Sequence, residues 1–181
     1  MRLFTAIDLP AEMLEKLRAF LARLRPLAKF RWTAAEDLHI TTKFIGEWPE
    51  ARIDEMKTAL SGVTSPAPID ISVRGLGWFP DLHRPRVFWA GVQGAEPLAA
   101  LAHATEQAVA KLGVPIETRA YSPHLTLARV RDQVQLEELL AWAGDPDFGG
   151  FQASSFFLYV SQGGRDLGAR YSKLAEFPFN S

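Results

Sequence analysis

The sequence predicts a fold of mixed helices and strands that is divided into two similar halves. Segments with strand-like and helix-like patterns alternate along the chain. A short pattern, histidine, any residue, threonine (H-x-T), occurs at His39 and again at His124. His39 follows Phe4 by 35 positions, and His124 follows Phe88 by 36 positions, so the two copies have matched places. Although helices and strands alternate in many α/β proteins, this match favours a duplicated β-α-β-α-β unit.

Alternating apolar residues predict the strands, and apolar residues at helical spacing predict the helices. Proline and glycine mark the breaks, as at Pro26 after the first helix and Gly113 after the third. For the first half, residues 1–80, we expect a strand at 2–9, a helix at 10–26, a strand at 38–45, a helix at 50–60 and a strand at 69–79. For the second half, 86–181, we expect a strand at 87–92, a helix at 97–112, a strand at 123–130, a helix capped by Asp132 that carries Val134, Leu136, Leu139 and Leu140, and strands at 151–160 and 171–179. The segments 145–150 and 163–166 are expected to be loops.

Composition limits the class of protein. The chain has 181 residues, 48% apolar and 23% charged, which is typical of one globular domain, here expected to have two lobes. It has no cysteine, which excludes disulfides and thiolate chemistry. No apolar run of about 18 residues and no signal-peptide pattern occurs, so we expect no membrane association and a cytoplasmic location. The net charge of −1 argues against coating of long nucleic acid but permits a local cationic pocket.

Each H-x-T copy lies in a β-favouring run, where residues two apart share a face. Each copy therefore presents one imidazole and one hydroxyl side by side, from His39 with Thr41 and from His124 with Thr126. Two such faces brought together form a symmetric pocket for general acid–base chemistry, in which a neutral imidazole accepts a proton and a protonated one donates it. The threonine hydroxyls can donate to phosphoryl oxygens. The residues themselves do not decide which histidine has which role.

Three neighbours are further candidates for the site. Lys43 has the same strand parity as His39 and is expected to add positive charge there. Arg129 would face away from a regular strand, but a bulge or the strand end would bring it to a bound anion. Asp37 also shares the parity of His39 and is a weaker candidate for a metal ligand or orienting group.

Neither a metal nor a cofactor is expected. Two histidines without a nearby third ligand do not complete the usual zinc set. The chain contains neither a P-loop nor a dinucleotide fingerprint. The other two histidines, His83 and His103, lack a partner threonine and are interpreted as non-catalytic.

The sequence resembles the two-histidine (2H) phosphoesterases, specifically the bacterial and archaeal RNA 2′,3′-cyclic phosphodiesterases, also called 2′-5′ RNA ligases. The likeness covers nearly the whole chain and is specific because four segments match in order. They are Arg31-Trp32 with Asp37 to Gly46, Gly77 to Phe79 with Arg84 to Ala90, Ser122 to Val130, and Leu158 to Ser161 with Gly168 to Tyr171. Thr42 departs from the family pattern, in which leucine is common, but it is expected to lie on the opposite face from the histidines.

The resemblance implies an α+β fold of two lobes, with two antiparallel sheets lining a central cleft and helices outside. It implies hydrolysis of RNA ends or small nucleotides with a 2′,3′-cyclic phosphate to 2′-phosphomonoesters, without a metal or cofactor, and 2′-5′ ligation in vitro. It also implies that His39 is the proton donor to the leaving 3′ oxygen and His124 the proton acceptor from water. Thr41, Thr126 and Arg129 match the positions that hold the phosphate, and a monomer is expected.

Two other functions remain open. The same site could act on a 2′-5′-linked oligoadenylate or a cyclic ADP-ribose phosphate. Alternatively, the chain could bind a nucleotide or RNA without turnover. The aromatic residues Phe44, Trp32 and Trp78 are candidates for stacking a base, although each also fits packing in the core.

Overall fold

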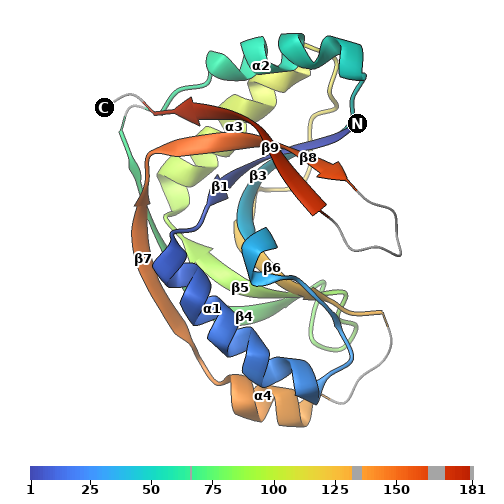
Figure 1. The fold of residues 1–181 in the computed structure, drawn as a ribbon, viewed down its shortest axis with the longest axis vertical. Coiled ribbons are helices and arrows are strands. Elements are labelled where there is room, and N and C mark those ends of the chain that lie inside the picture. The colour runs from blue at the N-terminus through green and yellow to red at the C-terminus, as the bar shows by residue number, and fades with distance from the viewer. Residues whose placement is uncertain (66, 132–135, 163–169, 180–181) are drawn as a thin grey trace.

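The computed structural model describes residues 1–65, 67–131, 136–162 and 170–179, and its strands form two sheets (Figure 1). The first sheet has the order β3-β1-β8-β9 and the second has the order β2-β6-β5-β4-β7. Every ladder between the described strands is antiparallel. The strands are β1 (Arg2–Asp8), β2 (Arg31–Trp32), β3 (His39–Glu47), β4 (Ile69–Phe79), β5 (Val87–Gln93), β6 (His124–Arg129), β7 (Asp147–Ala153), β8 (Ser155–Gln162) and β9 (Arg170–Pro178). The predicted α+β fold with two antiparallel sheets is confirmed.

Helices cover the outer face of each sheet. Figure 1 shows α2 and α3 against the first sheet and α1 and α4 beside the second, in agreement with the contacts α3–β3, α2–β9 and α1–β7. The helices are α1 (Ala11–Leu24), α2 (Ile53–Ser61), α3 (Ala95–Ala110) and α4 (Glu137–Ala143), with short 3-10 turns η1 (Arg25–Leu27), η2 (Ala35–Asp37) and η3 (Glu50–Arg52). Among the helices described, none combines the length and apolar character that crossing a membrane requires.

Helix α1 illustrates how the sequence pattern becomes packing. Pro10 precedes its first turn, and its buried face consists of Met13, Leu17, Phe20, Leu21 and Leu24. The ring of Phe20 meets Phe148 of β7 edge-on, with 5.1 Å between the ring centroids. The helix predicted at 10–26 is therefore confirmed, and it fixes the second sheet from outside.

The segment predicted as one strand at 151–160 is instead two strands in different sheets. β7 belongs to the second sheet and β8 to the first, and the chain crosses between them at Ser154. The loop expected at 145–150 is also wrong, because β7 begins at Asp147. Ser154 and Ser155 interrupt the apolar pattern, but the crossing contains neither proline nor glycine, so the sequence does not mark the change of sheet as a turn. Of the predicted fourth helix, Leu139 and Leu140 lie in α4, whereas Asp132, Val134 and the predicted loop 163–166 lie outside the described residues.

The two sheets have equivalent orders, β3-β1-β8-β9 and β6-β5-β4-β7. Strand β4, from residues 1–80, joins the second sheet next to β5, while β8, from residues 86–181, joins the first sheet next to β1. With β2 also in the second sheet and β9 also in the first, each half contributes two strands to the sheet of the other half. This correspondence supports the duplicated β-α-β-α-β unit, and it gives the H-x-T strands β3 and β6 equivalent places.

Candidate active site

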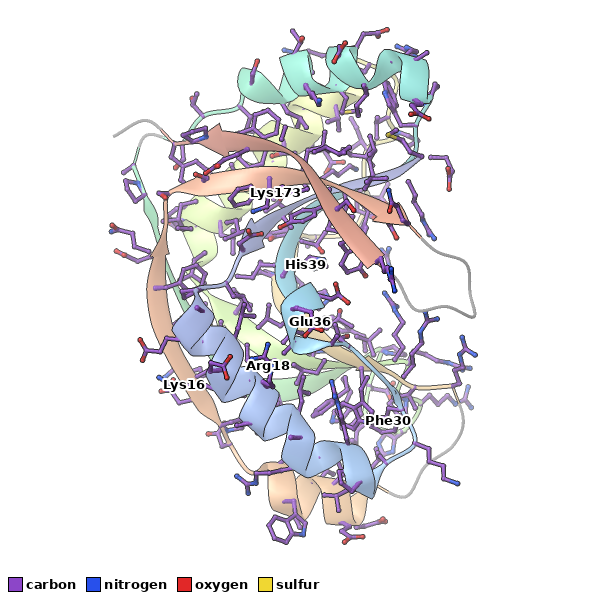
Figure 2. All side chains as sticks on the ribbon, in the orientation of Figure 1. Lys16, Arg18, Phe30, Glu36, His39 and Lys173 are labelled. Carbon is purple, nitrogen blue, oxygen red and sulfur yellow. The ribbon has the colours of Figure 1, made fainter. Side chains whose placement is uncertain are left out.

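A cleft of about 650 Å³ lies between the two sheets, and both H-x-T copies line it. His39, Thr41, His124, Thr126 and Arg129 all contribute to its wall. Strands β3 and β6, which carry the two copies, are in contact with each other. Figure 2 shows His39 near the middle of the molecule, between β9 and helix α1. The structure therefore brings together the five residues that the sequence suggested.

A β-bulge follows the threonine of the first copy. Strand β1 pairs Ala6 with Thr41 but Thr5 with Lys43, so Thr42 is the extra residue. Thr42 is buried away from the cleft, where its hydroxyl and that of Thr5 share a hydrogen bond of 2.7 Å. The expected orientation of Thr42 is confirmed.

The second copy has a bulge at the same place. Strand β5 pairs Trp89 with Thr126 but Phe88 with Ala128, which leaves Leu127 as the extra residue. Leu127 and Ala128 are both buried, so the strict alternation of the strand is broken. The duplicated halves therefore share this irregularity as well as the motif.

Each bulge reverses the side-chain parity beyond the threonine. The residue five positions after each histidine consequently faces the cleft, which is Phe44 in the first copy and Arg129 in the second. Arg129 reaches the cleft by the bulge that the sequence left as one alternative. The expectation that Lys43 adds charge to the site is wrong, because the bulge turns its side chain away.

Lys43 instead forms a buried ion pair beneath the strand. Its ammonium group donates to the carboxylate of Glu106 on α3 and to the carbonyl oxygen of Pro115 at 3.1 Å. The same carboxylate accepts the backbone N–H of Glu117 at 2.8 Å. Burial alone would raise the pKa of Glu106, but the hydrogen bonds from Lys43 and Glu117 outweigh it and lower the pKa. This cluster fastens β3 to α3 and to the loop before the second copy.

Replacing Lys43 with methionine is expected to lower the free energy of unfolding by about 2 kcal/mol, because Glu106 loses its charge partner at a site with little water. The lysine side chain is only 8% exposed and that of Glu106 17%. Urea unfolding of the single variants and of Lys43→Met with Glu106→Leu measures the coupling. We expect the double variant to lose less than the two single variants together, and strict additivity would contradict the pairing.

Both imidazoles are held by main-chain carbonyls two residues earlier in the chain. The Nδ1 of His39 lies 2.7 Å from the carbonyl oxygen of Asp37, and the Nδ1 of His124 lies 2.8 Å from that of Ser122. A carbonyl only accepts, so Nδ1 carries the proton in each ring and Nε2 is left for proton transfer. Asp37 lies in η2 rather than on the strand, but it lines the same cleft as His39, as expected, and it orients His39 through its backbone carbonyl.

The environment favours the neutral form of each imidazole. Burial is the main cause that lowers the pKa of His39, and the nearby His124 lowers it further, while a carbonyl hydrogen bond and Asp8 act in the opposite direction. Burial also lowers the pKa of His124, with an added contribution from Arg129. The influence of His124 on His39 indicates that the two rings share one electrostatic environment.

Aromatic rings limit the movement of both imidazoles. Phe4 stacks on His39 with 4.7 Å between ring centroids, and Tyr171 meets the same imidazole edge-on at 5.1 Å. Phe79 meets His124 edge-on at 4.9 Å. These contacts, together with the Nδ1 hydrogen bonds, fix the direction of each ring before any ligand binds.

Several cleft residues were not singled out from the sequence. Arg2, Phe4, Arg31 and Tyr171 line the cleft beside the H-x-T strands. Arg2 and Phe4 are two apart in β1 and so share a face, which was a usable signal in the sequence, whereas Tyr171 and Arg31 depend on the pairing of distant strands. Tyr121 donates its hydroxyl to the carbonyl oxygen of Thr41 at 2.9 Å, and so ties the loop before the second copy to the first.

Of the three aromatic candidates for base stacking, Phe44 lines the cleft and is 67% exposed. Trp78 stacks on buried Phe88 at 4.3 Å between ring centroids, and Trp32 packs against the core with its Nε1 bonded to the Ala28 carbonyl. The tryptophans are therefore packing residues.

The pairing of β4 with β5 explains why glycine is needed at position 77, since a Cβ there would lie 2.0 Å from the ring of Trp89.

His83 and His103 are exposed, and neither belongs to the cleft wall as described. Within the described ranges, no three His, Asp or Glu side chains are grouped closely enough to hold a metal ion.

Comparison with known proteins agrees with this geometry. The family model described as "LigT like Phosphoesterase" matches residues 7–89 and 92–163. The RNA 2′,3′-cyclic phosphodiesterase of Archaeoglobus fulgidus is 33% identical over 89% of this chain and 91% of its own, and that of Methanocaldococcus jannaschii is 34% identical with the same coverage. The crystal structure of E. coli LigT complexed with 3′-AMP has a TM-score of 0.82 and 28% identity, covering 99% of this chain and 98% of that one.

The crystal structure of E. coli LigT complexed with phosphate is also similar, with a TM-score of 0.78 over 99% of this chain and 98% of its own. The likeness thus extends over both sheets and over both strands that carry the H-x-T copies. The family model likewise includes both copies. The chain belongs to the LigT-like phosphoesterase family, within the 2H superfamily.

Proposed function

We propose that this protein hydrolyses 2′,3′-cyclic phosphates at RNA ends or on small nucleotides to 2′-phosphomonoesters by acid–base catalysis from its two histidines. One observation carries the proposal: His39 and His124 line one cleft, and each is held through Nδ1 so that Nε2 is left for proton transfer. The names of the similar archaeal proteins support the substrate class.

The mechanism follows from one neutral and one protonated imidazole. His124, as the base, removes a proton from water while the oxygen attacks phosphorus. The bond between phosphorus and the 3′ oxygen breaks, and His39, as the acid, gives its proton to that oxygen. The product carries a 2′-phosphate and a 3′-hydroxyl, and a proton transfer between the rings or through solvent restores the initial state.

Thr41, Thr126 and Arg129 are proposed to hold the phosphoryl group. Their side chains line the cleft beside the imidazoles, where hydroxyl and guanidinium donors stabilise the charge that develops on the non-bridging oxygens. Phe44, exposed on the same wall, is placed to stack the base of the terminal nucleotide. No step uses a metal or a cofactor. A 5′-hydroxyl in place of water would give a 2′-5′ linkage, which is the proposed basis of ligation in vitro.

A metal-free assay tests this function. The protein is incubated in EDTA with a short RNA that ends in a 2′,3′-cyclic phosphate, and the products are separated by chromatography. We expect a 2′-phosphate to accumulate at the same rate with EDTA as without it. A 3′-phosphate would mean that the other oxygen leaves, and loss of activity in EDTA would contradict the metal-free mechanism.

If the RNA is not converted, 2′-5′ oligoadenylate and a cyclic ADP-ribose phosphate are the next substrates. Binding of a 2′-nucleotide without any product would instead identify a binding module. Because all the residues proposed to act come from one cleft in one chain, we also propose that the active species is a monomer. Sedimentation of the active fraction checks this.

A further inference from the structure

The cleft carries more positive charge than one cyclic phosphate requires. Arg2 and Arg31 line it in addition to Arg129, and Asp37 is the one acidic residue of the described wall. Glu47 lies opposite Arg2 in the β1–β3 ladder, but its side chain is 82% exposed and lies 3.9 Å from the N-terminal ammonium group. A cyclic phosphodiester has a single negative charge, for which Arg129 suffices.

Two of these arginines are direct cross-strand neighbours. Arg31 of β2 pairs with Arg129 of β6, so both side chains leave the same face of the second sheet, toward the cleft. Two guanidinium groups side by side on the cleft wall can bind the oxygens of neighbouring phosphates, so the placement is suited to a substrate with more than one phosphate.

The first sheet faces this pair with a row of donors. Arg2 of β1 is opposite Ser161 of β8, which in turn is opposite Tyr171 of β9, and all three line the cleft. The Tyr171 ring also contacts His39. Arg129, Arg31 and Arg2 each act to lower the pKa of Tyr171, against the larger effect of burial, so its phenol senses all three guanidinium groups. The row therefore extends the site outward from the imidazole.

We propose that Arg2 and Arg31, with the hydroxyls of Ser161 and Tyr171, form a second anion subsite for the phosphodiester on the 5′ side of the terminal nucleotide. This inference rests on the proposed function. A 2′,3′-cyclic phosphate ends its strand, so any further phosphate of the substrate lies on its 5′ side. Guanidinium groups bind phosphate oxygens through paired hydrogen bonds, and hydroxyls commonly contact the nucleic-acid backbone. The subsite makes an RNA strand, rather than a mononucleotide, the preferred substrate.

Three substrates test the subsite with wild-type protein. They are a nucleoside 2′,3′-cyclic phosphate, the same molecule with a 5′-phosphate, and a dinucleotide with a terminal 2′,3′-cyclic phosphate. We expect kcat/KM to be about tenfold or more higher for the dinucleotide than for the nucleoside, as one charge-assisted phosphate contact allows. Equal values for these two would overturn the proposal, as would a gain confined to the 5′-phosphate compound.

Variants then show which residues cause the higher kcat/KM for the dinucleotide. Arg2→Gln and Arg31→Gln are each expected to lower the ratio of kcat/KM for the dinucleotide to kcat/KM for the nucleoside by about tenfold. For longer RNA, each is also expected to reduce the slope of log KM against log salt concentration by about 0.7, the value for one lost phosphate contact. Tyr171→Phe keeps the ring against His39 and is expected to lower the same ratio by a smaller factor. Arg23→Gln, on the outer surface of α1 over Trp142, is the matched control and should leave the ratio unchanged.

The experiment separates the subsite from the proposed function. Hydrolysis of the nucleoside cyclic phosphate reports the function itself, whatever happens to the ratio. If none of the substrates is cleaved, the proposed function fails, and fluorescence anisotropy with a labelled 2′-phosphorylated dinucleotide still tests the subsite. The inference would be overturned if Arg2→Gln and Arg31→Gln fold correctly and bind this dinucleotide as tightly as the wild-type protein does.

Discussion

Replacing His39 or His124 with asparagine is expected to lower kcat by about 10²- to 10⁴-fold while the chain remains folded. The amide of asparagine can still donate to the carbonyl oxygens of Asp37 and Ser122, which now accept from Nδ1 of the imidazoles. It cannot exchange a proton at the position of Nε2. Steady-state kinetics on a cyclic-phosphate substrate give the effect, and circular dichroism with urea unfolding verifies the fold.

The chain provides its own controls for this prediction. His83→Asn and His103→Asn change exposed histidines away from the cleft wall, and they should keep wild-type kcat. Because the two imidazoles act in one step of the proposed mechanism, the double variant at His39 and His124 should be little worse than either single variant. Retention of more than about a tenth of kcat in a single variant would be incompatible with positioned acid–base catalysis by that residue.

The identity of the site could be predicted from the sequence because its chemistry is local. His39 with Thr41, and His124 with Thr126, need only the two-residue period of a strand to share a face. Beyond the threonines this period fails. The bulges at Thr42 and Leu127 arise from pairing with β1 and β5, and no residue type in β3 or β6 indicates them. Extending the two-residue alternation beyond the threonines therefore placed Lys43 on the wrong face and did not decide which face Arg129 is on.

The pairing of the strands was the part of the fold that could not be predicted from the sequence pattern. Only Ser154 and Ser155 separate the alternating residues that end at Ala153 from the apolar run that begins at Phe156, so the segment resembles one strand even though its two ends add to different sheets. Contacts between distant segments decide the crossing at Ser154. The row of Arg2, Ser161 and Tyr171 depends on the same long-range pairing, which explains why the composition of the cleft wall was recognised only in part.

The pH profile of kcat/KM is expected to be bell-shaped with its maximum below pH 6.5. In the free enzyme the base must be neutral and the acid protonated, so the acidic limb reports the pKa of the base and the basic limb that of the acid. Burial lowers the pKa of both His39 and His124 from the ordinary value of 6.5. Both limbs should therefore lie on the acid side of that value, and kcat/KM should fall as the pH rises through neutrality.

Two variants assign the limbs to residues. Asp8 acts to raise the pKa of His39, so Asp8→Asn should lower that pKa and, if His39 is the acid, move only the basic limb to lower pH. Arg129 acts to lower the pKa of His124, so Arg129→Gln should move the acidic limb to higher pH, whatever it does to the rate. Movement of the opposite limbs would exchange the proposed roles. Limbs that stay fixed in both variants would show that groups other than these imidazoles control the profile, and the two-histidine mechanism would have to be abandoned.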